Sequence, residues 1–290
     1  MDELIPLIVG EPHGEGRQVV RLHNPCYPRS SEIEHIDIGN GDLVNFACAG
    51  PIGWFIRSVS KRNHVPNPRG STHTGVALID NPQYVWRTIF NLTPNEQNRG
   101  FGCTIEEKTG KWMLEKIRKY YGDDLGVIGG GEIWRPFVFE ANTTLGQLCH
   151  GVHPHTQIRP FVKALKYDGN VDLRSINFAI PIDFSRRFMG EHVGRPYETF
   201  STCRELFHAA RNGNLPERTE KVFCSELASA FYIRAIEESD LENKGELIAR
   251  FRNSSNILPE RFCDDIGEYD LLEGLASTER ALKVKFAVTE

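Results

Sequence analysis

The segment STHTGVALID, residues 71–80, constrains the fold more than any other part of the chain. It begins with small polar residues and continues as a short apolar run, which is typical of a β-strand. Side chains alternate along a strand, so every second residue shares a face. On one face these residues are His73, Gly75, Ala77 and Ile79. That face is mostly small, which lets a helix approach it closely.

A second pattern is a helix that begins at a cysteine. In CSELASAFYIRAIEES, residues 224–239, apolar residues recur at i, i+4 and i+7, which indicates an amphipathic helix. The turn-forming stretch before it and Glu226 in its first turn favour a start at Cys224. Unpaired N–H groups and the helix dipole stabilise an anion there, so the position favours a thiolate.

A reactive thiolate needs a base, and the base needs a carboxylate or amide to fix its orientation. Residues 135–142, RPFVFEAN, are predicted as another strand, with Val138 and Glu140 on one face and apolar side chains on the other. Glu140 is the charged exception in this strand. We expect His73 and Glu140 to serve Cys224 if their strands are neighbours.

The remaining segments show weaker signals. Residues 1–40 are rich in turn formers and are interpreted as an extension or edge strand. The long connection over 81–132 contains a helix at 104–122 and is interpreted as an insertion packed on the core. Further elements are expected as follows: strands over 41–50, 158–167 and 175–183, and helices over 53–61 and 184–193.

Composition narrows the classes of function. The net charge is −5 and Lys and Arg are scattered, which argues against nucleic acid as a partner. No stretch approaches the ~20 apolar residues that cross a bilayer. The acidic N-terminus is unlike a signal peptide, and seven cysteines without a CxxC pair favour reduced thiols. We expect a cytoplasmic protein, although delivery in a virus particle or by specialised secretion would leave the same signature.

The order of short motifs carries a family resemblance. GDLVNFACAGPIGWFIRSVS, THTGVAL, VFEA, GVHPHTQIRP, GRPYE and VFCSELASAFY occur in this order between about residues 41 and 235. Together they resemble the circularly permuted branch of the NlpC-type papain-like cysteine hydrolases, in particular YiiX-like bacterial proteins and, more distantly, lecithin retinol acyltransferases. In that branch the histidine of an H-x-G strand precedes the cysteine that begins a C-S-E-L helix.

The resemblance implies roles for individual residues. Cys224 would be the nucleophile, His73 the general base and Glu140 the residue that orients it. Tyr197 of GRPYE matches a tyrosine near the site in relatives. Gly75 of the H-x-G motif and Ser225 of the C-S-E-L motif would line the site.

The resemblance also implies a fold. We expect an α+β papain-like domain over 41–240, in which an antiparallel sheet packs against the Cys224 helix on the face that bears His73 and Glu140. Residues 241–290 would form a C-terminal extension packed on this domain. The connection between His73 and Glu140 is longer than in simple members of the branch, and neither extension matches a familiar segment.

The expected activity is that of a peptidase or amidase that cleaves an amide bond through a thioester on Cys224, without a metal or cofactor. One alternative is a lipid acyltransferase or lipase that uses the same Cys–His site. A second is a non-catalytic structural or binding protein of a larger assembly. No oligomeric state follows from the sequence.

Two motifs suggest other chemistry but fit poorly. Cys149, His150, His153 and His155 form a C-H-x-x-H-x-H cluster that lacks the paired spacing of structural zinc, and they are interpreted as solvated loop residues. The glycine triplet 129–131 is interpreted as a turn, since no P-loop lysine follows.

Overall fold

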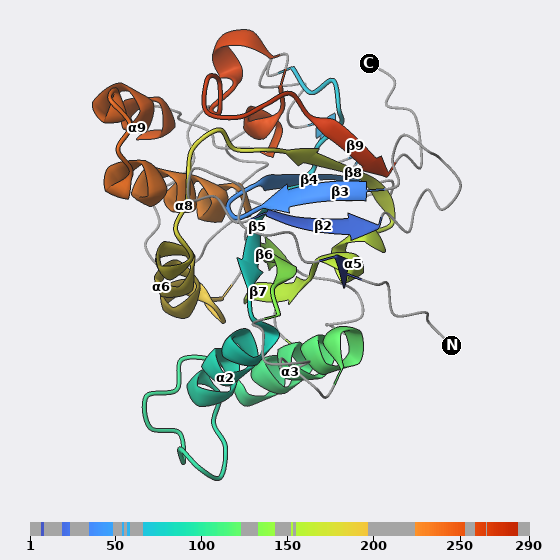
Figure 1. Cartoon of the computed structure of the whole chain (residues 1–290), viewed down its shortest axis with the longest axis vertical. Coiled ribbons are helices and arrows are strands. Elements are labelled where there is room, and N and C mark those ends of the chain that lie inside the picture. Colours follow the sequence, from blue (N-terminus) through green and yellow to red (C-terminus); the bar gives the residue numbers. More distant parts are fainter. Residues whose placement is uncertain are drawn as a thin grey trace.

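A six-stranded antiparallel sheet forms the centre of the structure, a computed structural model of the 290-residue chain (Figure 1). The strand order is β7-β6-β5-β4-β8-β9. The strands are β4 (Leu43–Cys48), β5 (His73–Asp80), β6 (Arg135–Asn142), β7 (His155–Pro160), β8 (Gly169–Arg174) and β9 (Arg280–Lys283). Helices pack on this sheet, so the fold is α+β, as the sequence predicts.

The structure describes residues 7–8, 19–23, 35–48, 54, 57–58, 66–122, 133–142, 152, 155–196, 224–252, 259–264 and 266–283. Several residues named above lie outside these ranges. They are Tyr197, Cys149, His150, His153 and the glycines at 129–131.

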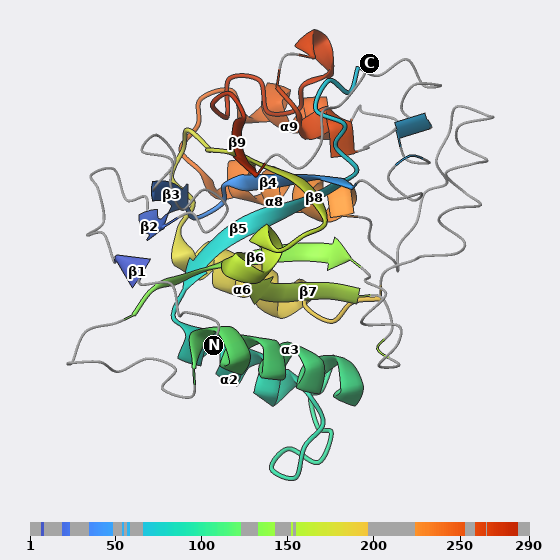
Figure 2. The ribbon, with the colours of Figure 1, turned by 90° about the vertical axis from the view of Figure 1, so that its right-hand side faces the viewer.

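The N-terminal region contributes a second, smaller sheet. It consists of β1 (Leu7–Ile8), β2 (Val19–His23) and β3 (His35–Gly39), which pair in that order. Val20 and Ile36 pack with side chains from one face of the main sheet, beside which this small sheet lies (Figure 2). These strands pair with one another and not with the edge of the main sheet, so they differ from the edge-strand alternative.

Six helices are described in the ranges given above. They are α2 (Pro82–Leu92), α3 (Glu107–Tyr121), α5 (Phe161–Leu165), α6 (Ile182–His192), α8 (Cys224–Glu238) and α9 (Lys244–Arg252). No helix in this part of the chain is both long and apolar enough to cross a bilayer. Helix α2 begins where the Asn81 side chain accepts from the Gln83 N–H at 2.8 Å, with Pro82 at the first helical position. With α3 it forms the helical pair of the 81–132 connection.

The two faces of β5 belong to two different hydrophobic cores. Val76 and Leu78 pack with residues of α2, α3, α6, α8 and α9 in the larger core. Ala77 and Ile79 pack with α5 and the small sheet in the other. Because His73 shares its face with Ala77 and Ile79, helix α8 packs on the opposite face from the one expected.

Two predicted strands are wrong. The segment 158–167 holds only the end of β7 and then forms the short helix α5, after Pro160 ends the strand. The segment 175–183 follows β8 (Gly169–Arg174) and contains no strand before α6 begins at Ile182. Both segments are apolar enough to be buried, and burial alone does not distinguish a strand from other structure. The helices predicted over 104–122 and 184–193 are present as α3 and α6.

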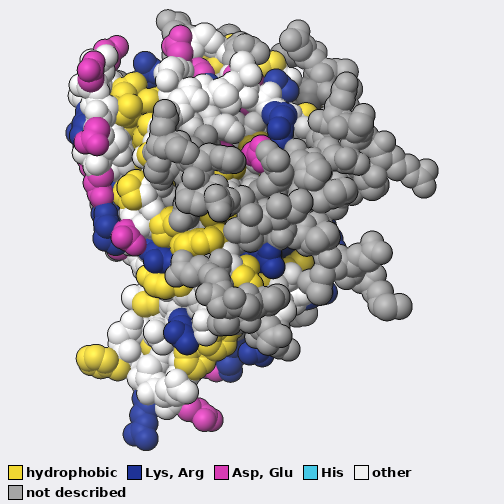
Figure 3. Space-filling model, viewed as in Figure 1, with side chains coloured by type: hydrophobic (Ala, Val, Ile, Leu, Met, Phe, Trp, Pro, Cys, Tyr) yellow, Lys and Arg dark blue, Asp and Glu magenta, His cyan; other side chains and the backbone are white. Residues whose placement is uncertain are grey.

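On the face shown in Figure 3, the Lys and Arg side chains that are coloured lie among acidic and hydrophobic ones. They do not gather into a single broad field on this described surface. The arrangement matches the scattered charge of the sequence.

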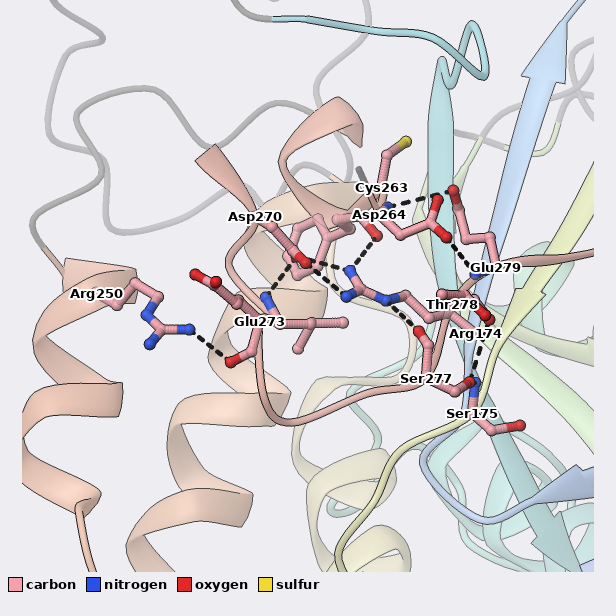
Figure 4. A network of polar contacts seen from close by, with 12 residues as sticks. Arg174, Ser175, Arg250, Cys263, Asp264, Asp270, Glu273, Ser277, Thr278 and Glu279 are labelled. Carbon is pink, nitrogen blue, oxygen red and sulfur yellow. Dashed lines mark hydrogen bonds and ion pairs between the residues drawn. The ribbon is translucent and has the colours of Figure 1, made fainter. Parts of the chain in front are cut away.

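The C-terminal segment 259–283 is attached to the sheet by a buried polar network (Figure 4). Arg174 of β8 donates to both carboxylate oxygens of Asp270, at 2.6 and 2.5 Å. The Asn45 side chain on β4 donates to Glu279 and to the carbonyl of Phe262. The segment then ends in β9, an edge strand of the main sheet, so it completes the domain.

Two carboxyl groups in and beside this network have raised pKa values. Burial raises the pKa of Glu279 to about 8, against the hydrogen bond from Asn45 and with added repulsion from Asp172 and Asp264. Burial likewise raises the pKa of Asp172 to about 6, opposed by Arg69 and assisted by Asp264. Both carboxyl groups keep their protons to a higher pH than an ordinary acid because burial penalises the charge.

Glu279→Gln should change how stability depends on pH. An acid whose folded pKa lies above its ordinary value of 4.5 binds more protons when folded, so its contribution is complete below that value and is lost as pH rises toward about 8. At about 1.4 kcal/mol per pKa unit, we expect a loss of a few kcal/mol in the wild type that the variant avoids. Urea denaturation at several pH values between 4.5 and 9 measures it.

The matched control is Glu273→Gln, an exposed acid of the same segment. It should keep the wild-type slope of unfolding free energy against pH. Equal slopes in the wild type and in both variants would contradict the assignment.

Candidate active site

Cys224 and His73 meet at the ends of two elements. Cys224 is the first residue of α8 and His73 is the first residue of β5. Although α8 packs on the other face of the sheet, a hydrogen bond and an electrostatic interaction join the Cys224 side chain to the imidazole. The contact is possible because Cys224 is the first residue of its helix and His73 is the first residue of its strand. At these ends neither side chain is enclosed by the rest of the sheet face on which its element packs.

His73 is fixed from behind by Glu140. Its Nε2 lies 2.8 Å from Oε2 of Glu140, which comes from the neighbouring strand β6. A carboxylate can only accept here, so Nε2 carries a proton. The Nδ1 nitrogen is then the one left for the Cys224 thiol.

Glu140 is itself held by two side chains of β7. Gln157 donates to its Oε1 at 2.8 Å, and Arg159 donates to its Oε2 at 2.9 Å. The Nε of Arg159 also lies 2.7 Å from Oε1, so the guanidinium is in ion-pair contact with both carboxylate oxygens. Glu140 is fully buried, so its charge is compensated inside the protein.

Aromatic rings pack beside the imidazole. The ring of Phe46, on β4, has its centroid 5.3 Å from that of His73 and 5.0 Å from that of Tyr167. The guanidinium carbon of Arg159 lies 5.5 Å from the centre of the Phe46 ring. The Phe46 ring therefore lies near both the cation and the imidazole and limits the positions that each can adopt.

The imidazole holds its proton more strongly than an ordinary histidine. Burial alone would lower the pKa of His73, but the charges of Cys224 and Glu140 and hydrogen bonds to both raise it to about 9. At neutral pH the imidazolium is therefore favoured. Such a group is a ready counter-ion for a thiolate and a proton donor to a leaving group.

Exposure differs along this group of three residues. Cys224 and His73 are 6% and 7% exposed, whereas Glu140 has no exposed surface. Within the described residues, Cys224 and His73 therefore keep a small exposed surface that Glu140 lacks.

Gly75 and Ser225 occupy different surroundings. A Cβ atom at Gly75 would lie 2.7 Å from Cγ1 of Val138 and 3.2 Å from Cβ of Glu140. Because Gly75 has no side chain, the side chains of Val138 and Glu140 can pack directly against its backbone. Ser225 is buried in the first turn of α8, and its place at the wall of a substrate site stays a prediction.

The described residues offer little to a metal ion. Among them no group of three or more His, Cys, Asp or Glu side chains is arranged to hold one.

His155 is not a solvated loop residue as expected, because it begins β7 and is 2% exposed beside the ring of Trp112. Its neighbours in the sequence cluster lie outside the described ranges.

Sequence reasoning missed Gln157 and Arg159. They stand two positions apart on β7, so they share a face, and Gln157 is paired with Glu140 in the register of the strands. The motif TQIRP therefore contains two polar residues at the spacing that places both on one face of a strand. It was missed because the predicted strand began at 158 and continued past Pro160.

Comparison with known proteins yields one structural likeness and little else. No family model and no curated protein sequence matches the chain. Among solved structures, the crystal structure of metalloprotein YiiX from Escherichia coli O157:H7 is similar over 76% of this chain and 85% of that chain. The identity is 13% and the TM-score is 0.31, values that do not establish a shared fold. The function is therefore argued from the residues themselves.

Gly75→Ala should destabilise the protein and disturb the His73–Glu140 pair. The new methyl group would have to displace Val138 or Glu140, and overpacking of this kind costs about 1–3 kcal/mol. Urea denaturation measures the loss.

Gly190→Ala is the matched control, because a Cβ atom there meets no atom within 4 Å and the residue lies inside helix α6. This change should stabilise the protein by up to about 1 kcal/mol through helix propensity. A Gly75→Ala variant as stable as the wild type would contradict the close packing described here.

Proposed function

We propose that this protein is a cysteine hydrolase of the papain-like kind that cleaves an amide bond through an acyl-enzyme on Cys224. The observation that carries the proposal is the chain of contacts from Cys224 to His73 to Glu140. A nucleophile, a base in contact with it and a third group that orients the base are the parts that thiol catalysis requires.

The acylation step follows from the charges of the site. The Cys224 thiolate attacks the carbonyl carbon of the substrate, and the C–N bond breaks. His73, protonated at neutral pH, gives its proton to the departing nitrogen, so the amine leaves neutral. Backbone N–H groups at the start of α8 are suited to stabilise the oxyanion, since a helix N-terminus presents unpaired donors.

The second step restores the enzyme. A water molecule loses a proton to the now neutral His73 and attacks the thioester carbonyl carbon. The C–S bond breaks, the carboxylic product leaves and Cys224 returns to its thiolate beside the imidazolium. The preference for an amide comes from the resemblance of the motifs to bacterial peptidases and amidases, and no cofactor is required for either step.

The thiol should show reactivity that depends on His73. We expect iodoacetamide at pH 6–8 to alkylate Cys224 at least ~10-fold faster than Cys103, a partly exposed cysteine that serves as an internal control. The advantage should shrink at high pH, where an ordinary thiol is also largely ionised, and should disappear in His73→Ala. Mass spectrometry of peptides measures both sites in one sample, and Cys224→Ala verifies the assignment. Equal labelling of Cys224 in wild type and His73→Ala would favour a non-catalytic role.

Products should distinguish a hydrolase from a transferase. Incubation with a mixed peptide library should release new amino termini and leave an acyl adduct on Cys224 after acid quenching. His73→Ala should lower the rate by about 10²–10⁴-fold. An adduct formed only from a fatty acyl thioester, with no cleaved peptide, would instead support the acyltransferase or lipase alternative.

A further inference from the structure

Two cationic groups share one oxygen atom at the back of the site. Oε2 of Glu140 accepts from Nε2 of His73 at 2.8 Å and from Nη2 of Arg159 at 2.9 Å. The imidazolium and the guanidinium therefore lie within the length of two hydrogen bonds of each other. Like charges at that separation repel, and they compete for the same carboxylate.

Arg159 cannot easily leave this position. Its side chain is 6% exposed, its fork contacts both oxygens of Glu140, and the Phe46 ring lies against it. A guanidinium stays charged throughout the accessible pH range. Its charge is therefore a constant feature of the site, whereas the charge of His73 changes.

We propose that Arg159 is a positioning residue that balances the charge of Glu140 and thereby sets the pH at which the His73 imidazolium gives up its proton. Without this cation, Glu140 would hold the imidazolium proton too strongly for His73 to alternate between acid and base. The role of Arg159 in catalysis rests on the proposed function of Cys224. Its effect on the titration of His73 can be measured whether or not the protein is a hydrolase.

Charged and titratable groups from several elements lie at the imidazole or around its partner Glu140. The described ones are Glu140 on β6, Arg159 on β7, Cys224 on α8, Cys48 on β4 and Tyr167 after α5, the last two interacting with each other. Of these, Arg159 is the one permanent cation. Removal of Arg159 should raise the pKa of His73, because it removes a repulsion that acts on the protonated imidazole.

The test is the NMR titration of His73 in a Cys224→Ala background, which removes the thiolate and does not need turnover. Arg159→Gln keeps a hydrogen-bond donor for Glu140 but loses the charge, so the His73 midpoint should rise by about one pH unit. Arg159→Lys restores the cation and should bring the midpoint back to within about 0.3 unit of the parent.

The matched control is Arg186→Gln. Arg186 of α6 forms a similar two-pronged pair with Asp80, which lies at the opposite end of β5 from His73. Its loss should leave the His73 midpoint unchanged. A midpoint that does not move in Arg159→Gln, or that moves equally in Arg159→Gln and Arg159→Lys, would overturn the proposal.

A second comparison applies if the Arg159→Gln variant, which leaves the buried Glu140 charge without its guanidinium, does not fold. Glu140→Gln and the double variant Glu140→Gln/Arg159→Gln differ only in the cation and contain no buried carboxylate at this position. The His73 midpoint should be higher in the double variant, and equal midpoints would overturn the proposal. If instead Cys224 alkylation proves independent of His73, the proposed hydrolase fails while this titration still reports on Arg159.

Discussion

A charge that is buried on a β-sheet must find its compensation on the neighbouring strands, and the Glu140 carboxylate is such a charge. It has no exposed surface, and it accepts hydrogen bonds from His73 on one side and from Gln157 and Arg159 on the other. Removal of one partner from a buried ion pair typically costs about 3–5 kcal/mol. The carboxylate therefore fixes the register of three strands, because a slip of one residue would turn its donors to the other face.

Helix α8 contacts His73 even though the helix covers the opposite face of the sheet. The apolar residues of α8 pack against Val76 and Leu78, and alternation sends His73 to the other side of β5. The first residue of the helix and the first residue of the strand meet there. The reactive pair thus depends on where two elements begin, while the rest of each element supplies packing.

The sequence predicted what depends on local pattern. It gave the two faces of β5, the strand that carries Glu140 and the helix that begins at Cys224, since each shows a clear periodicity. It did not predict the helix face, because alternation states which residues share a side but not which side a distant helix covers. Gln157 and Arg159 were missed for a related reason, since a polar residue on a strand is meaningful only once its cross-strand neighbour is known.

Strand β4 joins the candidate site to the C-terminal segment. Its successive residues face opposite ways, so Phe46 packs beside His73 while Asn45 binds Glu279 and the Phe262 carbonyl. Thr72, just before His73, donates its N–H to the Phe46 carbonyl at 2.8 Å. Glu279 is therefore bound by the same strand that carries the Phe46 ring beside the imidazole. The C-terminal segment thus contacts β4 on one face of the sheet, while the other face of the same strand packs beside His73.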